Sequence, residues 1–460
     1  MKEIKIDIIP VSQTICKIRN AAPEPDFKAI CVFAATGFFL DQDTYWKDEK
    51  VLRPGTINTK EDGYLKNSST WFKWYYKPRQ ISFDQALAEF TVLFEDIIKD
   101  QAQGSPIILP LSGGLDSRTQ ALALSRLGNE VSSYSYSFSG GYPEGKIAEK
   151  VAKACNFPFQ EFFIPGGYLW NEIEELAEIN KCYSEFTHPR QMAVLQELKK
   201  MQGILSLGHW GDVLFDRGAP DVLKEKDQLN YLLKGVVKKS GMELALSLWK
   251  AWGLEGQFED YLKERVSNLL SAIEISNTSS RIRAFKSMYW APRWTSTNLS
   301  IFAQANPISL PYYDDRMCKF ICEIPEAYLA DRRLQIAYLK QSKSLAGITW
   351  EAHKPFNLYN YKYNKVPYNL PYRILKKAKR ETAVLRGEKY IQRNWELQFL
   401  GDRNDKNLKN YLFNSSFNQF IPQSLVAEFY TNFREMDGVK YSHAVSTLLT
   451  LSLWNRKFNE

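Results

Sequence analysis

Residues 107–117 read Ile107-Ile108-Leu109-Pro110-Leu111-Ser112-Gly113-Gly114-Leu115-Asp116-Ser117. The apolar run at 107–111 predicts a strand, and the segment 118–126 predicts a helix. A strand, a tight turn and a helix place several backbone N–H groups at a helix N-terminus, where the helix dipole favours an anion. Because Gly113 and Gly114 lack a Cβ atom, a phosphate can approach the main chain and φ can become positive.

The side chains of this loop indicate which phosphate chemistry it serves. No lysine follows the glycines, so the loop is not the G-x-x-x-x-G-K-[ST] loop of other nucleotide-binding proteins. Ser112 and Ser117 add hydroxyl donors, while Asp116 would lie close to bound phosphates, which requires a divalent cation between them. We therefore predict a pyrophosphate-binding loop with a metal-binding carboxylate. The alternative is a glycine-rich turn before an ordinary helix.

The hexapeptide S-G-G-x-D-S at 112–117 resembles the pyrophosphate loop of the ATP pyrophosphatase group, and its surroundings resemble asparagine synthetase. Enzymes of this group split ATP between the α and β phosphates, adenylate a carbonyl oxygen and release pyrophosphate. The resemblance implies that ATP and Mg²⁺ are bound, with Asp116 on the metal, and that the nucleotide contacts Leu111, Ser112, Gly113, Gly114, Leu115, Asp116, Ser117 and Gly208.

A second strand-to-loop element covers 204–215 and contains Gly208-His209-Trp210-Gly211-Asp212. It resembles the S-G-E-G-x-D-E-[LV]-F block of the same family. Matching Gly208 to the first glycine of that block places Asp212 on its magnesium-binding Asp and His209 on its catalytic Glu. Thr187-His188-Pro189 then falls at the spacing of the family's small-residue-Pro pair. The alternative for Asp212 is an N-cap of the next helix.

His209 leaves two roles open. An imidazole with a pKa near ~6.5 could deprotonate an attacking amine, as the family's Glu is thought to do. It could equally be a neutral hydrogen-bonding residue in a site with altered chemistry.

The acceptor side departs further from the family pattern. Leu310–Arg316 resembles the [VI]-P-F-L-D-x-R stretch, but in the segment 331–340, where the family has K-x-x-L-R, Ile336 falls on the catalytic Lys. Four cations could replace that lysine, and the sequence does not choose among Arg332, Arg333, Lys340 and Lys354.

Strands and helices are expected to alternate through 81–230, which predicts a parallel α/β sheet with helices on both faces. The expected strands are 107–111, 131–138, 159–164 and 204–208, and the expected helices are 81–103, 117–127, 144–155, 171–182 and 190–202. Ser82 and Gln85 form a plausible capping box at the first helix. We predict three parts: a short β-rich segment at 1–80, the ATP pyrophosphatase core at 81–230, and a mostly helical continuation at 231–460.

The N-terminal segment is expected to be strand-like, including residues 32–40, and resembles the last hairpins of a glutaminase domain. That domain uses an N-terminal Cys as nucleophile. Here residue 2 is Lys2, and Cys16 and Cys31 are internal, so they lack the free α-amine that would act as base. We predict no glutamine hydrolysis.

Composition restricts the class of protein. The chain has 460 residues, of which 44% are hydrophobic and 24% charged, so it is globular. We expect a cytoplasmic protein without a membrane span, since no apolar run reaches about 18 residues and no signal peptide is apparent. The six scattered cysteines suggest neither a zinc site nor a disulfide framework. A net charge of +8 is mild for this length, and we expect no nucleic-acid partner.

The resemblance implies an AMP-forming, ATP- and Mg²⁺-dependent carbon–nitrogen ligase of the asparagine synthase type. It would adenylate a small-molecule, peptide or sugar carboxylate and join it to ammonia or an amine, which a partner protein could supply. A lactam-forming, macrocycle-forming or sugar-acid-amidating enzyme is a variant of this chemistry. A non-catalytic nucleotide-binding paralogue is the alternative from another class.

Overall fold

A computed structural model describes residues 2–6, 9–141, 145–351, 354–387 and 391–459. The prediction of an α/β protein with a parallel sheet, a helical C-terminal region and short N-terminal strands is confirmed. No helix in the described ranges combines the length and the apolar character of a membrane span.

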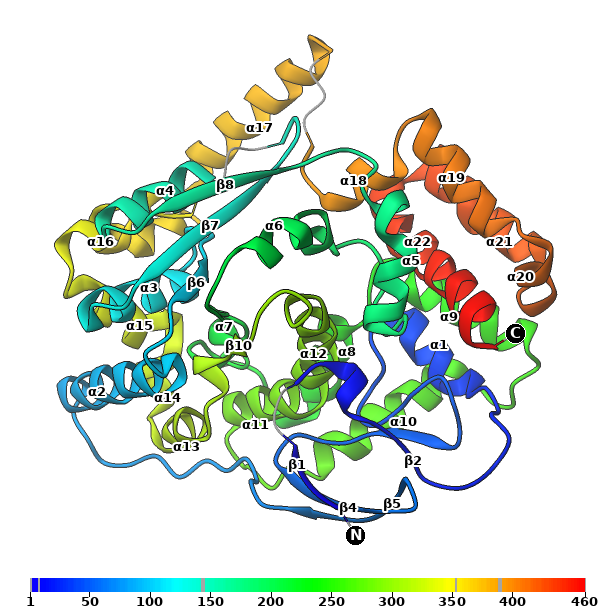
Figure 1. Ribbon diagram of the computed structural model, residues 1–460, viewed down its shortest axis with the longest axis horizontal. Helices are drawn as coiled ribbons and strands as arrows, with labels where there is room; N and C mark the ends of the chain where they lie inside the picture. The colour runs from blue at the N-terminus through cyan, green and yellow to red at the C-terminus, as the bar shows by residue number, and fades with distance from the viewer. Residues whose placement is uncertain (1, 7–8, 142–144, 352–353, 388–390, 460) are drawn as a thin grey trace.

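A five-stranded parallel sheet forms the centre of the α/β part (Figure 1). Its order is β10-β9-β6-β7-β8, and the strands are β6 (Ile107–Pro110), β7 (Val131–Phe138), β8 (Phe159–Ile164), β9 (Ile204–Ser206) and β10 (Ile308–Ser309). β6 lies between β7 and β9, and all these pairs are parallel. Since ligands bind at the carboxyl ends of such strands, the loops after β6 and β9 meet at one edge.

Both faces of this sheet are buried by helices. Ile107 and Leu109 of β6 belong to one hydrophobic cluster, whereas Ile108, which points to the opposite face, belongs to another. The helices before and between the first four strands of this sheet are α2 (Phe83–Ala102), α3 (Leu115–Leu127), α4 (Gly145–Ala154), α5 (Leu169–Asn180) and α6 (Leu195–Lys200). Residue 144, with which the predicted helix 144–155 begins, lies outside the described residues.

The start of α2 is fixed by its cap. The Ser82 hydroxyl accepts a hydrogen bond from the Gln85 N–H (3.1 Å), and the Gln85 side chain accepts one from the Ser82 N–H (2.9 Å). The predicted capping box is therefore confirmed.

The N-terminal region forms a separate five-stranded sheet of order β1-β4-β5-β2-β3, at the bottom of Figure 1. Its strands are β1 (Lys2–Ile6), β2 (Ile15–Lys17), β3 (Glu49–Val51), β4 (Thr56–Glu61) and β5 (Tyr64–Thr70).

The prediction of a strand-like segment at 32–40 is wrong. Residues Phe27–Thr36 form helix α1, which is almost entirely buried and packs against α9 (Gly241–Ala251). Asp26 caps its N-terminus by accepting a hydrogen bond from the Ala29 N–H, and Gly37 ends it with a φ of 81°. A continuous apolar run does not distinguish a buried strand from a buried helix, so the caps decide.

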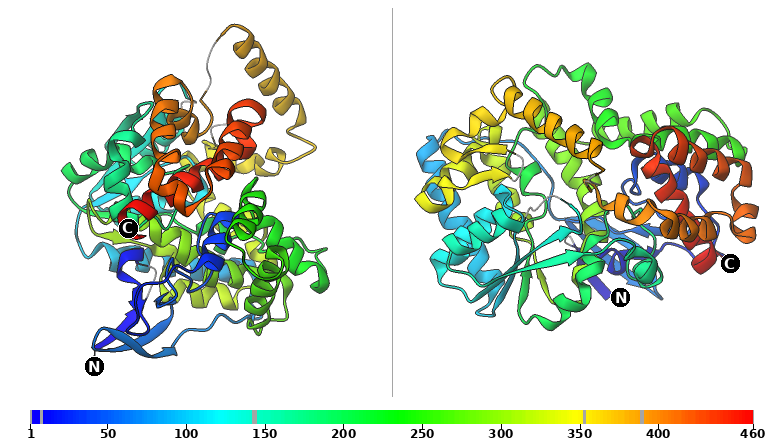
Figure 2. Two further views of the ribbon diagram at one scale, coloured as in Figure 1. Left: turned by 90° about the vertical axis from the view of Figure 1, so that its right-hand side faces the viewer. Right: turned by 90° about the horizontal axis from the view of Figure 1, so that it is seen from above.

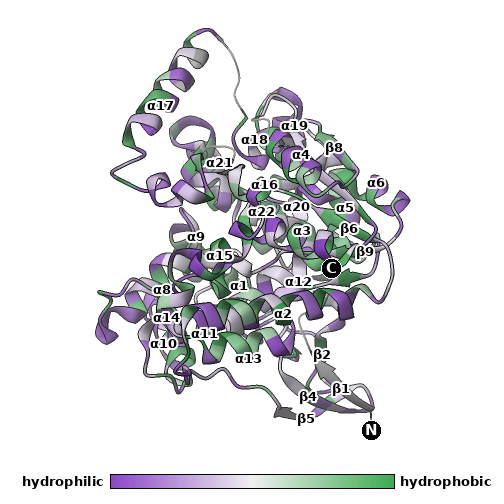
Figure 3. Ribbon diagram, turned by 90° about the vertical axis from the view of Figure 1, so that its left-hand side faces the viewer, coloured by the Kyte–Doolittle hydropathy of each residue, from purple (hydrophilic) through white to green (hydrophobic). Residues whose placement is uncertain are grey.

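The chain after residue 214 is mostly helical (Figures 1 and 2). Besides α9, the helices of at least eight residues are α8 (Gln228–Val236), α10 (Phe258–Ser271), α11 (Thr278–Phe285), α12 (Ala291–Phe302), α13 (Asp315–Glu323), α15 (Arg333–Lys340), α17 (Leu370–Leu385), α19 (Asp402–Leu412), α21 (Gln423–Thr431) and α22 (Gly438–Trp454). α22 is the core of the C-terminal group, since its residues from Tyr441 onward are buried. α17 projects from the body and carries both hydrophilic and hydrophobic residues (Figure 3).

Candidate active site

The loop between β6 and α3 presents the start of a helix to the edge of the sheet. Gly113 has a φ of 72°, and Gly114 is the N-cap of α3. Within the described residues no side chain caps this helix, so its first N–H groups are directed toward the loop. The Ser112 N–H donates to the Ser117 hydroxyl (3.3 Å), which closes the loop across the first turn.

The loop after β9 packs directly against the same helix start. Trp210 has a left-handed backbone with a φ of 71°, and α7 (Gly211–Leu214) follows it. A Cβ atom at Gly211 would lie 2.6 Å from Cγ of Asp116, and one at Gly208 would lie 3.3 Å from Cβ of Asp116. Only glycine leaves room at Gly211, so the two loops meet at Asp116.

Asp116 is held by residues from a third, distant segment. Arg332 forms an ion pair with its Oδ1 atom, and the Gln335 amide donates to the same oxygen (3.1 Å). The Tyr312 hydroxyl donates to the Asp116 carbonyl (2.9 Å). Burial raises the pKa of the Asp116 carboxyl and Asp212 raises it further, while the Arg332 guanidinium lowers it. The charge of Arg332 is the largest of the effects that lower the pKa of this carboxyl.

Asp212 lies in the first turn of α7 and is exposed. Its charge acts on Asp116 and on Lys286, whose pKa is lowered by burial in spite of that carboxylate. Asp116 and Asp212, which act on each other electrostatically, could together supply two carboxylate donors. No group of three His, Cys, Asp or Glu side chains suited to a metal occurs among the described residues. This set fits Mg²⁺ only when phosphate oxygens and water complete the coordination, which is how Mg²⁺ is usually held.

A cavity of about 510 Å³ opens beside the two loops. Its walls come from both loops, from the end of β7, from the segment after α5 and from α12. The lining residues are Pro110, Leu111, Ser112, Gly114, Asp116, Ser117, Tyr134, Ser135, Tyr136, His188, Arg190, Gln191, Leu207, Gly208, His209, Trp294, Asn298 and Phe302.

His209 faces this cavity with an imidazole that resists protonation. Burial lowers its pKa from 6.5 to about 4. Its Nδ1 atom is buried without a hydrogen-bond partner in the described part of the chain, and its ring meets Phe302 edge-on with centroids 6.0 Å apart. The ring is therefore neutral near pH 7, and the sequence-based value near ~6.5 is replaced by one about 2.5 pH units lower.

The structure brings most of the predicted site residues to this cavity and gives three of them other surroundings. Gly113 packs against α4, where an added Cβ atom would lie 2.6 Å from a methyl carbon of Ile147. Leu115 is buried in the hydrophobic cluster around α2 and α3. Asp212 lies beside Asp116 but does not line the cavity.

Among the four candidate cations, Arg332 reaches the site. Arg332 contacts Asp116, whereas Arg333 lies over the ring of Phe83 (5.1 Å) and Lys340 lies over that of Tyr359 (5.9 Å). Ile336 is buried, as expected of an apolar residue on the inner face of α15.

Two further arginines were not identified from the sequence. Arg118 is fully buried and donates to the carbonyls of Gly113 (2.7 Å) and Thr349 (2.6 Å), so it ties the loop to the segment after α16 (Lys343–Gly347). Arg190 lines the cavity with its guanidinium 5.5 Å from the centre of the Tyr136 ring. Neither carries a local signal, because each is an ordinary arginine until the fold places it.

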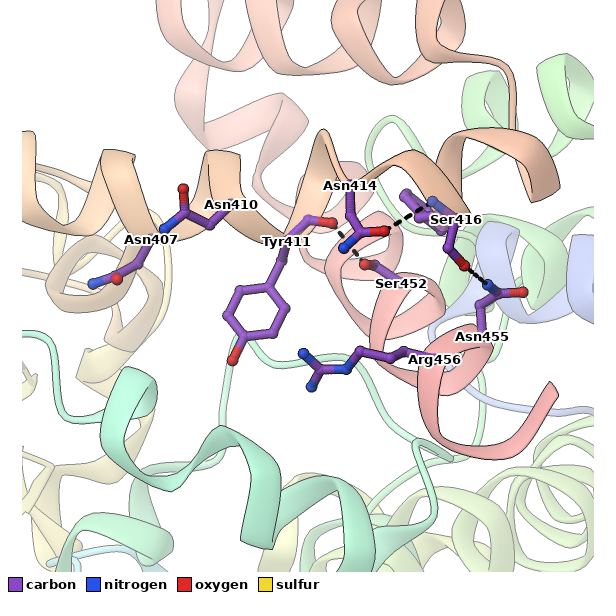
Figure 4. A pocket seen from close by; sticks show the side chains of 9 residues that line it. Asn407, Asn410, Tyr411, Asn414, Ser416, Ser452, Asn455 and Arg456 are labelled. Atoms are coloured by element: carbon purple, nitrogen blue, oxygen red, sulfur yellow. Dashed lines mark hydrogen bonds between the residues drawn. The ribbon is translucent and has the colours of Figure 1, made fainter. Parts of the chain in front are cut away.

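A second cavity, of about 250 Å³, lies among the C-terminal helices (Figure 4). Its polar groups bond to one another: the Ser416 N–H donates to the Asn414 side chain, the Asn455 amide donates to the Ser416 hydroxyl, and the Ser452 hydroxyl donates to the Tyr411 carbonyl. It contains no residue of the two loops, so the cavity at the sheet edge is the candidate active site.

A helix N-terminus with an adjacent carboxylate, at the carboxyl edge of a parallel sheet, is an arrangement found in nucleotide-binding α/β proteins. The sequence profile of asparagine synthase matches residues 89–456, and the chain belongs to that family. Family membership supports an ATP-dependent ligase.

Similar solved structures include an NMN synthetase from Francisella tularensis, 16% identical, covering 45% of this chain and 93% of its own, with a TM-score of 0.22. An NAD⁺ synthetase from Burkholderia pseudomallei is 12% identical and covers 38% of this chain and 94% of its own, with a TM-score of 0.20. No curated protein matches the chain.

Proposed function

We propose that the protein is an AMP-forming, ATP- and Mg²⁺-dependent ligase that converts a carboxylate into an amide. The observation that carries the proposal is the convergence of the two loops on Asp116 beside one cavity, in a chain of the asparagine synthase family. In the first step a carboxylate oxygen attacks the α-phosphorus of ATP, the bond to the β-phosphate oxygen breaks, and pyrophosphate leaves. In the second step a nitrogen attacks the acyl carbon, the bond to AMP breaks, and the nitrogen loses a proton.

The first loop is assigned to the phosphates. The N–H groups at the start of α3 and the hydroxyls of Ser112 and Ser117 would bind the pyrophosphate portion of ATP. Asp116 and Asp212 would hold Mg²⁺, which supplies positive charge that neutralises the phosphates. Gly208 and Gly211 allow the second loop to lie against Asp116, so that the two carboxylates share one location.

The remaining cavity residues are assigned to the carboxylate substrate. Arg190 gives this side of the cavity a positive charge, and the Gln191 amide donates to the Asn298 side chain (2.8 Å), which fixes two polar groups of the wall. A guanidinium is well suited to a carboxylate. A cavity of about 510 Å³ accommodates a ligand well above the size of a single small acid.

His209 is assigned a neutral hydrogen-bonding role in the second step. With a pKa of about 4 it is unprotonated near pH 7, but it is a weak base for an attacking amine. Its unpartnered Nδ1 atom can bond to a group of the substrate that enters the cavity.

The test is ATP–pyrophosphate exchange in the presence of Mg²⁺, with amino acids, sugar acids and short peptides as carboxylates. One of these classes of carboxylate should stimulate the exchange. The Asp116→Asn variant should lower the exchange rate by at least about 100-fold, as expected when a preorganised electrostatic group is lost. Asp84→Asn is the matched control, because Asp84 is also in the first turn of a helix but is exposed on α2.

Exchange at the wild-type rate in Asp116→Asn would contradict the assignment of the loop. ATP binding without exchange for any carboxylate would instead support the non-catalytic nucleotide-binding alternative.

A further inference from the structure

The ion pair between Arg332 and Asp116 places a protein cation on the carboxylate that is assigned to a metal. The two residues are 216 positions apart in the chain. The Arg332 side chain is only 7% exposed, so this is no exchangeable surface pair. Its Nε atom donates to the Gln335 side chain (2.6 Å), and Gln335 donates in turn to Asp116, which makes a closed set of contacts.

The backbone is built to direct Arg332 inward. Asp331 and Arg332 both have a left-handed conformation, with φ values of 58° and 62°, which is uncommon for residues other than glycine. The Asp331 N–H donates to the Asp216 side chain (2.9 Å), and the Asp331 carboxylate forms an ion pair with Lys365. These contacts hold the turn between α14 (Glu326–Leu329) and α15, so the guanidinium stays on Asp116 while Arg333 points away.

Charged side chains of both signs surround Asp116. The carboxylates of Asp116, Asp212 and Asp216 act on the Arg332 guanidinium, and those of Asp212 and Asp216 act on the Lys286 ammonium group. A divalent cation that entered alone would compete with the Arg332 guanidinium for the Oδ1 atom of Asp116 and would be repelled by its positive charge. A divalent cation entering with nucleotide phosphates brings the negative charge that compensates the displaced guanidinium.

We propose that Arg332 is a resident counter-ion of Asp116 that competes with divalent metal, so that the site takes up metal together with a nucleoside triphosphate and not before it. This inference rests on the proposed function for the identity of the nucleotide. The competition itself rests only on the ion pair.

The test measures the binding of Mn²⁺, which favours the same oxygen ligands as Mg²⁺. The concentration of free Mn²⁺ is determined from its electron paramagnetic resonance signal. With MnCl₂ alone, Arg332→Gln should bind Mn²⁺ at least about tenfold more tightly than the wild type, because the competing charge is gone. Arg332→Lys, which keeps the charge, should bind it weakly. Arg333→Gln makes the same change of net charge at the neighbouring exposed residue and should behave as the wild type.

The site of the added affinity is checked by Arg332→Gln combined with Asp116→Asn, which should lose it. Equal Mn²⁺ affinity of the wild type and Arg332→Gln would overturn the proposal, as would an equal gain in Arg333→Gln. If Arg332→Gln does not fold, the wild type alone decides: binding of Mn²⁺ by the wild type at micromolar concentration without nucleotide overturns the proposal.

A second titration, with MnCl₂ and α,β-methylene-ATP, separates the two proposals. The wild type should bind Mn²⁺ at least about tenfold more tightly with the nucleotide than without it, as expected when phosphates supply ligands. If neither the wild type nor any variant binds the nucleotide, the proposed function is refuted. The titrations with MnCl₂ alone still test whether Arg332 competes with metal for Asp116.

Discussion

Replacing His209 by Gln should change how the stability of the protein depends on pH. The folded protein holds this imidazole with a pKa of about 4, against 6.5 for the free side chain. Between these two values the unfolded chain binds a proton that the folded protein does not. The contribution of His209 therefore lowers the free energy of unfolding as the pH falls from 6.5 toward 4. Above pH 6.5 the residue has no effect on how that free energy depends on pH.

The size of the effect follows from the difference in pKa. The difference of about 2.5 pH units corresponds to about 3 kcal/mol at 1.36 kcal/mol per unit, reached in full only below pH 4. At pH 5 the same relation gives about 2 kcal/mol, and since the ring borders the cavity, water there reduces it to about 1–2 kcal/mol. Glutamine removes the titrating group but keeps a neutral hydrogen-bonding side chain.

The assay is urea unfolding of the wild type and His209→Gln at pH 7.5, 6.5, 5.5 and 5.0. Between pH 7.5 and 5.0 the wild type should lose about 1–2 kcal/mol more than the variant. His188 and His443 also have lowered pKa values through burial, but they are present in both proteins and cancel in the comparison. Parallel pH dependence, with the His209 Cε1–H resonance titrating near pH 6.5, would refute the argument and restore a general base at this position.

The remaining predictions concern the loops and the N-terminal region. Gly211→Ala should push α7 away from Asp116 and lower the free energy of unfolding by about 1–3 kcal/mol, whereas Gly235→Ala, with open space around it, should be neutral or slightly stabilising in chemical denaturation. Arg118→Leu should cost about 2–4 kcal/mol because it leaves buried carbonyls without donors, whereas Arg126→Leu on the exposed side of the same helix should cost less than about 1 kcal/mol. The purified chain should release no glutamate from glutamine, since both N-terminal cysteines are buried, and enzymatic detection of glutamate checks this.

The core sheet was predictable because its strands and helices differ in local pattern. β7 and β8 begin and end where the sequence placed them, and α3 ends at Leu127, before Gly128. These boundaries depend on alternation, caps and glycines, which are properties of neighbouring residues. The division of the chain at residues 80 and 230 stays a prediction.

Two elements escaped prediction for opposite reasons. α1 is so apolar that its pattern fits a strand as well as a helix, and the burial of Ala29–Thr36 depends on distant segments, namely α9 and His443 of α22. β10 has two residues, Ile308 and Ser309, too few for any periodic signal. It forms because it pairs in parallel with β9, where the Leu207 N–H donates to the Ser309 carbonyl (3.0 Å).

In the candidate site, too, the features set by neighbouring residues were predictable and those set by distant residues were not. Both loops follow strands and contain the glycines and aspartates of a local motif, so the sequence could identify them. His209 could be identified as a residue but not as a weak base, since its pKa depends on burial by distant groups such as Phe302.

Arg332 shows where a local pattern stops being informative. Four cations were candidates to replace the expected lysine, and two of them, Arg333 and Lys340, lie on α15 itself. The residue that contacts Asp116 precedes that helix, in a turn whose two left-handed residues are neither glycine nor asparagine. Such a turn is unfavourable locally and persists because tertiary contacts hold it. If those contacts are what keeps Arg332 on Asp116, then Lys365→Ala, which removes the ion pair of Asp331 at the surface, should raise the affinity for MnCl₂ part of the way toward that of Arg332→Gln.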